Sequence, residues 1–164
     1  MKERIKEKEE KTNVGRVLEE NGIPYTPYSY GDGTVTKGTE AARLIGKDPE
    51  QVFKTLVTQG KSGRHYVFVI PVAESLDLRK AAAHVKEKNI EMIPQKELLP
   101  LTGYVHGGCS PVGMKKSFPI TFDETAVLFD TIVFSAGKIG HQVEVSLGEL
   151  ARILSFDYAD VTET

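Results

Sequence analysis

The chain has 164 residues and a mass of 18.1 kDa, which fits one domain with its own hydrophobic core. Its single cysteine excludes an internal disulfide framework and a cysteine-rich zinc module. A net charge of −2 argues against a protein that wraps duplex nucleic acid, because that binding depends on many Lys and Arg contacts to phosphates.

The first eleven residues carry a charge at nine positions and have no apolar stretch, so they are not a signal peptide. We expect a charged flexible leader at residues 1–11 and a single domain at 12–164. An i,i+4 pair of opposite charges, Glu7 and Lys11, allows a frayed helix as an alternative for the leader. No window is apolar enough to span a membrane, and one cysteine suits a reducing compartment. We therefore expect a cytoplasmic protein without membrane or DNA partners.

The N-terminal half predicts two short helices, an extended segment and a hairpin, in the order helix 13–21, extended segment 24–30, helix 39–46 capped by Thr39, and strands 52–59 and 65–72. The hairpin is the clearest of these, since two runs of β-branched and aromatic residues flank the turn Gly60-Lys61-Ser62-Gly63. Asp48-Pro49-Glu50-Gln51 has the pattern of a helix start, with an N-cap, a proline at the first position and a capping-box glutamine.

In the C-terminal half, we expect a helix from Ser75 to about Lys88 with Leu78 on its buried face, and a second helix from a Ser146/Glu149 capping box through Leu154. A small helix is expected at 95–99. The expected strands are 90–93, 118–122, 126–129, 131–135 and 142–145, followed by an edge strand at 156–161. Short strands with helices between them, without regular β-α-β alternation, indicate an α+β domain. We expect a mixed, strongly curved, barrel-like β-sheet surrounded by helices.

Lys54 is a candidate functional residue because both faces of its predicted strand are apolar. It shares one face with Val52 and Leu56, while Phe53 and Val57 lie on the other. Burial of an ammonium group there is costly unless the group is paired or faces a ligand cavity. The alternative is an edge-strand lysine whose ammonium group reaches solvent.

The segment Gly107-Gly108-Cys109-Ser110-Pro111 lies in the least regular and most glycine-rich part of the chain. Adjacent glycines let consecutive backbone N–H groups converge, and a proline stiffens the turn, which favours an anion or oxyanion site. A tight structural turn is the alternative. No Gly-Lys-Ser/Thr sequence ends the segment, so it is not a nucleotide-binding P-loop.

Cysteine and histidine chemistry is the less favoured explanation of this segment. Cys109 with His106 or His141 would form a Cys-His nucleophile, which needs a lowered thiol pKa that the sequence does not indicate. The four histidines lack metal-ligand spacing, so we expect no metal and no cofactor. Residues 51–120 carry ten Lys and Arg against five Asp and Glu, a net +5 that is compatible with a local anionic ligand.

Five segments, taken together and in this order, resemble the YbaK/EbsC family, the free-standing relatives of the editing domain inserted in some bacterial prolyl-tRNA synthetases. The segments that carry the resemblance are Val52-Phe53-Lys54-Thr55-Leu56, Leu76-Asp77-Leu78-Arg79-Lys80, Thr102-Gly103-Tyr104, Gly107 through Lys116, and Ser135-Ala136-Gly137-Lys138. The resemblance covers about residues 13–160, and the combined spacing is specific where each piece is not.

The resemblance implies a trans-editing aminoacyl-tRNA deacylase that clears mischarged Cys-tRNA(Pro), as a hydrolase, or as a lyase-type enzyme if the substrate thiol cyclises. Its partners would be the aminoacylated 3′ end of tRNA and, as a candidate, prolyl-tRNA synthetase. Lys54 matches the family's key lysine, and Gly107 through Pro111 match its Gly-x-x-x-Pro signature. The catalytic set would be Lys54, Gly107 and Gly108, and the substrate-binding set Tyr30, Thr55, Ser110, Pro111, Ser135, Gly137 and Gln142.

Cysteine and proline are close in size, so a proline pocket cannot reject cysteine by steric exclusion and editing must use the thiol. In the mechanism that the resemblance implies, this thiol attacks its own ester carbonyl. Lys54 then holds the tRNA end or the carbonyl region, and the N–H groups of Gly107 and Gly108 stabilise the oxyanion.

Two positions depart from the family's pattern, because Lys37 stands where an aromatic residue is common and Gln142 where an acidic residue is common. An Ala-tRNA(Pro) deacylase of the same superfamily is therefore an alternative. A non-catalytic module that binds tRNA ends or a synthetase is a second, and a nucleotide- or phosphate-binding protein a weaker third.

Overall fold

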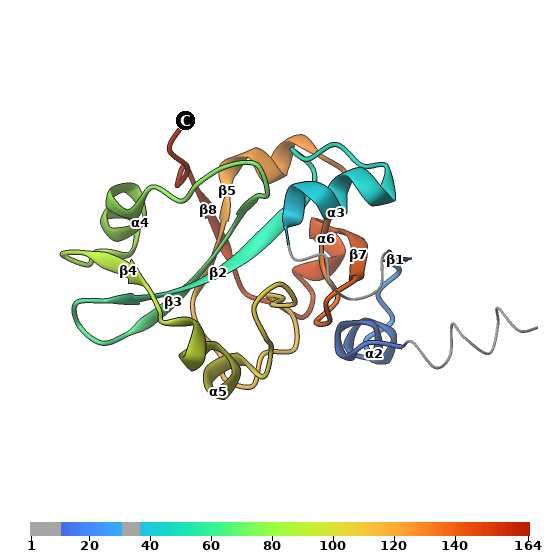
Figure 1. Cartoon of the computed structure of the whole chain (residues 1–164), viewed down its shortest axis with the longest axis horizontal. Coiled ribbons are helices and arrows are strands. Elements are labelled where there is room, and N and C mark those ends of the chain that lie inside the picture. Colours follow the sequence, from blue (N-terminus) through green and yellow to red (C-terminus); the bar gives the residue numbers. More distant parts are fainter. Residues whose placement is uncertain (1–10, 31–36) are drawn as a thin grey trace, which may run out of the picture.

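The computed structural model describes residues 11–30 and 37–164 (Figure 1). Its elements are α2 (Asn13–Glu20), β1 (Thr26–Ser29), α3 (Gly38–Ile45), β2 (Phe53–Gly60), β3 (His65–Pro71), α4 (Leu78–Val85), β4 (Ile90–Met92), η1 (Gln95–Glu97), α5 (Leu98–Thr102), β5 (Ile120–Asp123), η2 (Glu124–Leu128), β6 (Thr131–Ser135), β7 (His141–Ser146), α6 (Leu147–Leu150) and β8 (Asp157–Ala159). No helix within these described ranges is long and apolar enough to cross a membrane. The predicted leader, with Glu7, lies outside the described residues except for Lys11, whose ammonium group pairs with Glu19.

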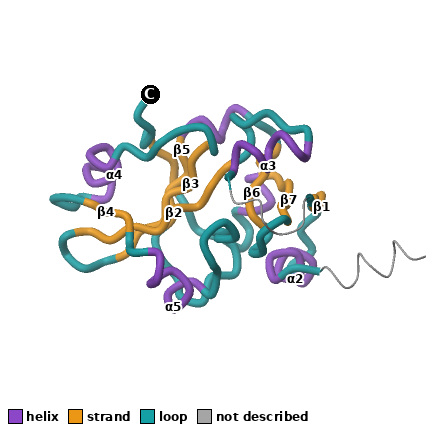
Figure 2. The backbone as a smooth tube through the Cα atoms, in the orientation of Figure 1, coloured by secondary structure: helices purple, strands orange, loops and turns teal. Residues whose placement is uncertain are grey.

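The strands form two sheets rather than one closed barrel. A five-stranded mixed sheet has the order β4-β2-β3-β5-β8, and a three-stranded antiparallel sheet has the order β1-β7-β6. An isolated bridge connects Val52, the residue before β2, to Val133 of β6. The predicted α+β class with a mixed sheet and surrounding helices is confirmed (Figure 2), whereas the barrel-like description is too strong because one bridge does not close the sheets.

Two clusters of buried apolar side chains bear on the position of the site. Side chains from both sheets pack into one main cluster that includes Phe53, Phe122 and Phe134, all at most 2% exposed. A smaller cluster of Val52, Val72, Val133 and Ala42 lies beneath α3. Helix α3 therefore covers the junction of the two sheets, beside the end of β2 that carries Lys54.

Two predicted helix N-caps were each wrong by two residues. Helix α3 has Lys37 as its N-cap rather than Thr39 and begins at Gly38. A Cβ at Gly38 would overlap the side chain of Val72, so the first turn of the helix packs closely on this residue. Helix α4 is capped by Asp77 rather than Ser75, since the Asp77 carboxylate accepts from the N–H groups of the first turn.

Other predictions failed where short-range hydrogen bonds decide the backbone. The segment at 126–129 is not a strand, because the Asp123 carboxylate accepts from the amide and hydroxyl of Thr125 and starts the 3-10 helix η2. The helix-start pattern at 48–51 is a turn, in which Gln51 N–H donates to the Asp48 carbonyl. Leu78 is 40% exposed rather than buried.

Candidate active site

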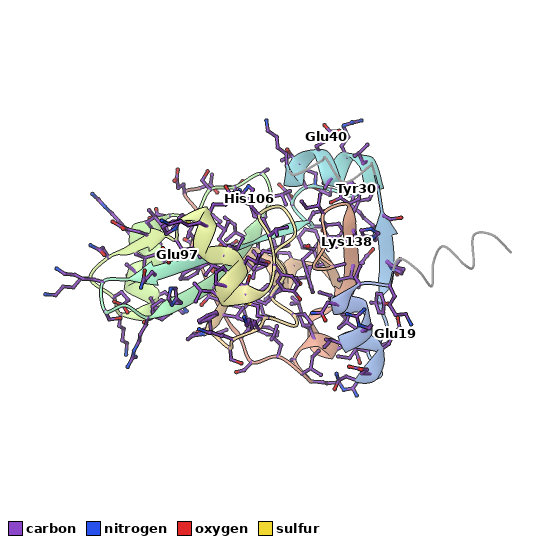
Figure 3. All side chains as sticks on the ribbon, turned by 60° about the horizontal axis from the view of Figure 1, so that its bottom comes forward. Glu19, Tyr30, Glu40, Glu97, His106 and Lys138 are labelled. Carbon is purple, nitrogen blue, oxygen red and sulfur yellow. The ribbon has the colours of Figure 1, made fainter. Side chains whose placement is uncertain are left out.

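A cavity of about 150 Å³ lies between α3, the start of β2 and the glycine-rich loop. Its lining residues come from eight separate stretches of the chain and are Tyr30, Lys37, Gly38, Ala41, Phe53, Lys54, Thr55, Leu56, Val72, Leu98, His106, Gly107, Cys109, Ser135 and Gln142. Figure 3 labels two of them, Tyr30 after β1 and His106 on the loop. A cavity of similar volume in another protein holds benzene, so this one suits a group of about six heavy atoms.

The cavity brings together most of the predicted site residues, namely Tyr30, Lys54, Thr55, Gly107, Ser135 and Gln142. The remaining predictions, Gly108, Ser110, Pro111 and Gly137, lie in the same loop and turn but do not line it. Apolar lining residues such as Val72 and Leu98 were missed, because no local pattern marks them as neighbours of β2.

Lys54 lies on β2, which stands between β3 and β4 in the sheet order. Strand β4 pairs only with the far end of β2, at 58–60, and of the described strands β3 alone pairs with β2 at Lys54. Its side chain is half-buried and no carboxylate of the described residues lies within salt-bridge distance. Desolvation lowers the pKa of Lys54, and the more distant Glu74 carboxylate opposes this shift. The cavity is thus lined by a lysine with which no carboxylate in residues 11–30 and 37–164 pairs directly.

The two neighbouring glycines of the glycine-rich loop, Gly107 and Gly108, have different roles. Gly108 donates its N–H to the Val105 carbonyl at 3.0 Å, and a Cβ on Gly108 would lie 3.1 Å from the Ile139 nitrogen. This glycine therefore packs the loop against the β6–β7 turn. Gly107 has a φ of 88° and lines the cavity, and among the described residues its N–H has no partner. Of the two predicted oxyanion donors, Gly107 is the one whose N–H remains available.

Tyr104 locks the loop to the β6–β7 turn. Its hydroxyl donates to the Val112 carbonyl and accepts from the Asn13 side chain, whose nitrogen lies 3.0 Å away. A Cβ on Gly137, which has a φ of 93°, would lie 2.7 Å from the Tyr104 ring. The Gly137 N–H donates to the Ser135 hydroxyl at 3.1 Å, so Gly137 supports a cavity residue from outside the cavity.

Two polar atoms of the cavity residues are buried without a hydrogen-bond partner in the described part of the chain, Thr55 Oγ1 and Gln142 Oε1. The other end of the Gln142 amide donates to the Tyr30 hydroxyl at 3.1 Å. Leaving such an atom unsatisfied costs about 1–3 kcal/mol. Native proteins keep few such groups, which makes these two atoms candidates for contacts with a bound ligand.

Cys109 lines the cavity but is a poor nucleophile. The side chain is buried, and this burial raises the pKa of its thiol to about 12. A thiol with this pKa is almost fully protonated at neutral pH, whereas the thiolate is the reactive form. The geometry thus disfavours a Cys-His nucleophile, although His106 lies on the same cavity wall.

Metal ligands are not assembled either. In residues 11–30 and 37–164, no three His, Cys, Asp or Glu side chains are grouped so that they would hold a metal ion.

A small cavity lined by a lysine and by a glycine whose N–H is available combines two kinds of group that are able to stabilise a developing oxyanion. The chain belongs to the aminoacyl-tRNA editing domain family, which matches residues 33–153, and is an enzyme of the aminoacyl-tRNA deacylase class. The resemblance inferred from the sequence motifs is thereby confirmed.

Two relatives and one solved structure support this assignment. A protein of Enterococcus faecalis named as the Cys-tRNA(Pro)/Cys-tRNA(Cys) deacylase EbsC is 37% identical over 158 residues, which cover 96% of each chain. A proline–tRNA ligase of Kosmotoga olearia is 32% identical over 110 residues, covering 66% of this chain but only 19% of the ligase. A crystal structure described as a trans-editing enzyme for prolyl-tRNA synthetase superposes with a TM-score of 0.79 at 26% identity, covering 93% of this chain and 96% of the other.

Proposed function

We propose that this chain clears cysteine from mischarged Cys-tRNA(Pro) in trans. The observation that carries the proposal is the cavity itself, which has room for about six heavy atoms and is lined by Lys54 and Gly107. A cysteinyl group has about six heavy atoms. The named activity of the relative EbsC supports the same substrate.

The residues of the cavity then have separate roles. The Gly107 N–H donates to the ester carbonyl oxygen as negative charge develops there. The Lys54 ammonium group stabilises the same charge or the neighbouring tRNA end electrostatically, and the low polarity of its half-buried site strengthens this effect. Thr55 and Ser135 contact the rest of the aminoacyl group, while Pro111 and Ser110 hold the loop in shape.

The enzyme supplies no nucleophile in this mechanism. The substrate thiol attacks its own carbonyl carbon, so that a C–S bond forms and the ester C–O bond to the terminal ribose breaks. The thiol proton passes to the departing ribose oxygen, and the products are a cyclic thiolactone and free tRNA. This route uses a reactive group that proline lacks, and it fits the buried Cys109 thiol with its pKa of about 12.

The partners follow from the same proposal. The chain binds the aminoacylated 3′ end of tRNA, which needs few phosphate contacts and is compatible with a net charge of −2. Prolyl-tRNA synthetase is the candidate second partner, which the match to a proline–tRNA ligase supports. A protein with these partners acts in translation, so the location that we propose is the cytoplasm.

A second candidate is clearance of Ala-tRNA(Pro). The apolar cavity residues Phe53, Val72 and Leu98 suit a small methyl side chain. Alanine has no thiol, so this reaction needs water as the nucleophile.

The test is deacylation of Cys-tRNA(Pro), Ala-tRNA(Pro) and Pro-tRNA(Pro) by the wild-type protein, with the released amino acid product identified by mass spectrometry. The proposal predicts fast loss of cysteine as thiolactone and slow loss of proline. Fast release of alanine alone would establish the second candidate. Binding of all three tRNAs without deacylation would overturn both and leave a binding module.

A further inference from the structure

Gln142 occupies an unusual place for a polar residue. It lies on β7, between β1 and β6, and its side chain is 7% exposed. Its amide nitrogen donates to the Tyr30 hydroxyl at 3.1 Å, which orients the group. Its Oε1 atom therefore faces away from that bond and has no partner among the described residues.

The hydrogen-bonding inventory of the cavity shows what this oxygen needs. Lys54 and the Gly107 N–H are donors. The hydroxyl of Ser135 already accepts from Gly137. The Gln142 carboxamide oxygen can only accept, so a ligand that satisfies it must bring a donor to this wall of the cavity.

We propose that Gln142 is a specificity-determining residue whose carboxamide oxygen accepts a hydrogen bond from the primary α-amino group of the aminoacyl ester. This inference rests on the proposed deacylase function. The acceptor atom of the ester, its carbonyl oxygen, then faces the donors Lys54 and Gly107, while its α-amino group faces the acceptor Gln142. The carbonyl oxygen of the substrate thus meets hydrogen-bond donors of the cavity, and its α-amino group meets a hydrogen-bond acceptor.

The same contact discriminates against proline. The proline nitrogen is a secondary amine within a ring, so in the same protonation state it has one N–H fewer than the amine of cysteine or alanine. Its ring carbon would also have to lie against the wall formed by Gln142 and Tyr30. The ring carbon keeps the remaining N–H of proline from reaching Gln142 Oε1, so this buried oxygen stays unpaired when a prolyl ester is bound. Gln142 thereby protects correctly charged tRNA(Pro).

The test compares two esters that differ only at this nitrogen, Cys-tRNA(Pro) and 3-mercaptopropionyl-tRNA(Pro), in which hydrogen replaces the α-amino group. Both retain the thiol that cyclises. The expected result is that Gln142→Leu lowers kcat/KM for the cysteinyl ester by about tenfold to a hundredfold, the range of a hydrogen bond to a polar or charged group. Its kcat/KM for the mercaptopropionyl ester stays at the wild-type value. Equal losses on both esters would overturn the inference.

Two further variants keep the test decisive. Gln142→Glu retains an acceptor oxygen and is expected to preserve the preference for the cysteinyl ester, including the case in which Gln142→Leu does not fold. Loss of that preference in Gln142→Glu would contradict the α-amino contact. Gln59→Leu is the matched control at the far end of β2, where the glutamine amide donates to the Gly63 carbonyl in the hairpin turn. A wild-type protein that clears neither ester refutes the proposed function itself, which separates that failure from a failure of this inference.

Discussion

The two ends of strand β2 differ in the hydrogen bonding of their polar side chains. At the hairpin end, the Thr58 hydroxyl donates to the Tyr66 carbonyl at 2.8 Å, and the Tyr66 hydroxyl donates to the Glu87 carboxylate at 2.6 Å. At the cavity end, Thr55 Oγ1 has no partner and Lys54 no salt bridge within the described residues. On the neighbouring strand β3, His65 Nε2 at the hairpin end also has no partner among the described residues. On β2 itself the buried hydroxyl is satisfied at the hairpin end and unsatisfied at the cavity end, which indicates where a ligand belongs.

Glycine substitutions give the largest expected stability difference between the two ends. Gly137 beside the cavity and Gly63 in the hairpin turn have φ values of 93° and 92°, so alanine is strained at both. A Cβ at Gly137 also meets Tyr104, whereas nothing lies within 4 Å of one at Gly63. We expect Gly137→Ala to lower the free energy of unfolding by about 2–4 kcal/mol and Gly63→Ala by about 1 kcal/mol. Urea titrations that give equal losses would contradict the packing role of Gly137.

Threonine substitutions test the comparison on β2 itself. Thr58→Val removes a satisfied buried hydroxyl and is expected to cost about 1–2 kcal/mol of unfolding free energy. Thr55→Val removes a hydroxyl without a partner, so its stability should equal or exceed that of the wild type while its deacylation rate falls. Thermal melting and single-turnover deacylation measure the two effects. If Thr55→Val were the more destabilised variant, the contrast between the two ends of β2 would be wrong.

The pH dependence of stability should report the desolvated lysine. Burial lowers the pKa of Lys54 in the folded state, so over the pH range between this value and the ordinary lysine pKa the unfolded chain binds more protons. The folded state therefore gains stability as pH rises through this range. Relative to Lys54→Met, the wild type should become more stable as the pH rises toward the ordinary lysine pKa of about 10.4. A constant difference, or one of the opposite sign, would show that Lys54 is solvated like a surface lysine.

The smallest expected effect is on Cys109. Its thiol, with a pKa of about 12, should react slowly with iodoacetamide at neutral pH in the folded protein. Cys109→Ser should retain most of the deacylase activity, because the substrate supplies the thiol. Loss of nearly all activity in this variant, with its melting temperature preserved, would restore the Cys-His nucleophile.

The sequence predicted the elements that local patterns determine. The β2–β3 hairpin was correct because β-branched runs flank a glycine turn, and the helix that begins after Thr12 was correct because Gly22 follows it. The apolar run at 126–129 misled because Val127 and Leu128 are 60% and 75% exposed, so their apolar character does not mark a buried strand. The sequence of one short segment does not show which of its side chains the rest of the protein buries.

In the candidate site too, some features were predictable from the sequence and others were not. Lys54 was predictable, because a lysine between two apolar strand faces conflicts with ordinary burial. The separate roles of Gly107 and Gly108 were not, since they depend on contacts with Val105 and Ile139. The unsatisfied oxygen of Gln142 was equally hidden, because it results from the orientation that Tyr30 imposes.

The most direct test of the central claim compares Lys54→Ala with Lys61→Ala in single-turnover deacylation of Cys-tRNA(Pro). Lys61 is the matched control, an exposed lysine in the hairpin turn at the other end of β2. Loss of preorganised electrostatic stabilisation predicts a rate at least about a hundredfold lower for Lys54→Ala, with normal folding, and a wild-type rate for Lys61→Ala. Wild-type clearance by a folded Lys54→Ala protein would contradict the assignment of this cavity as the active site.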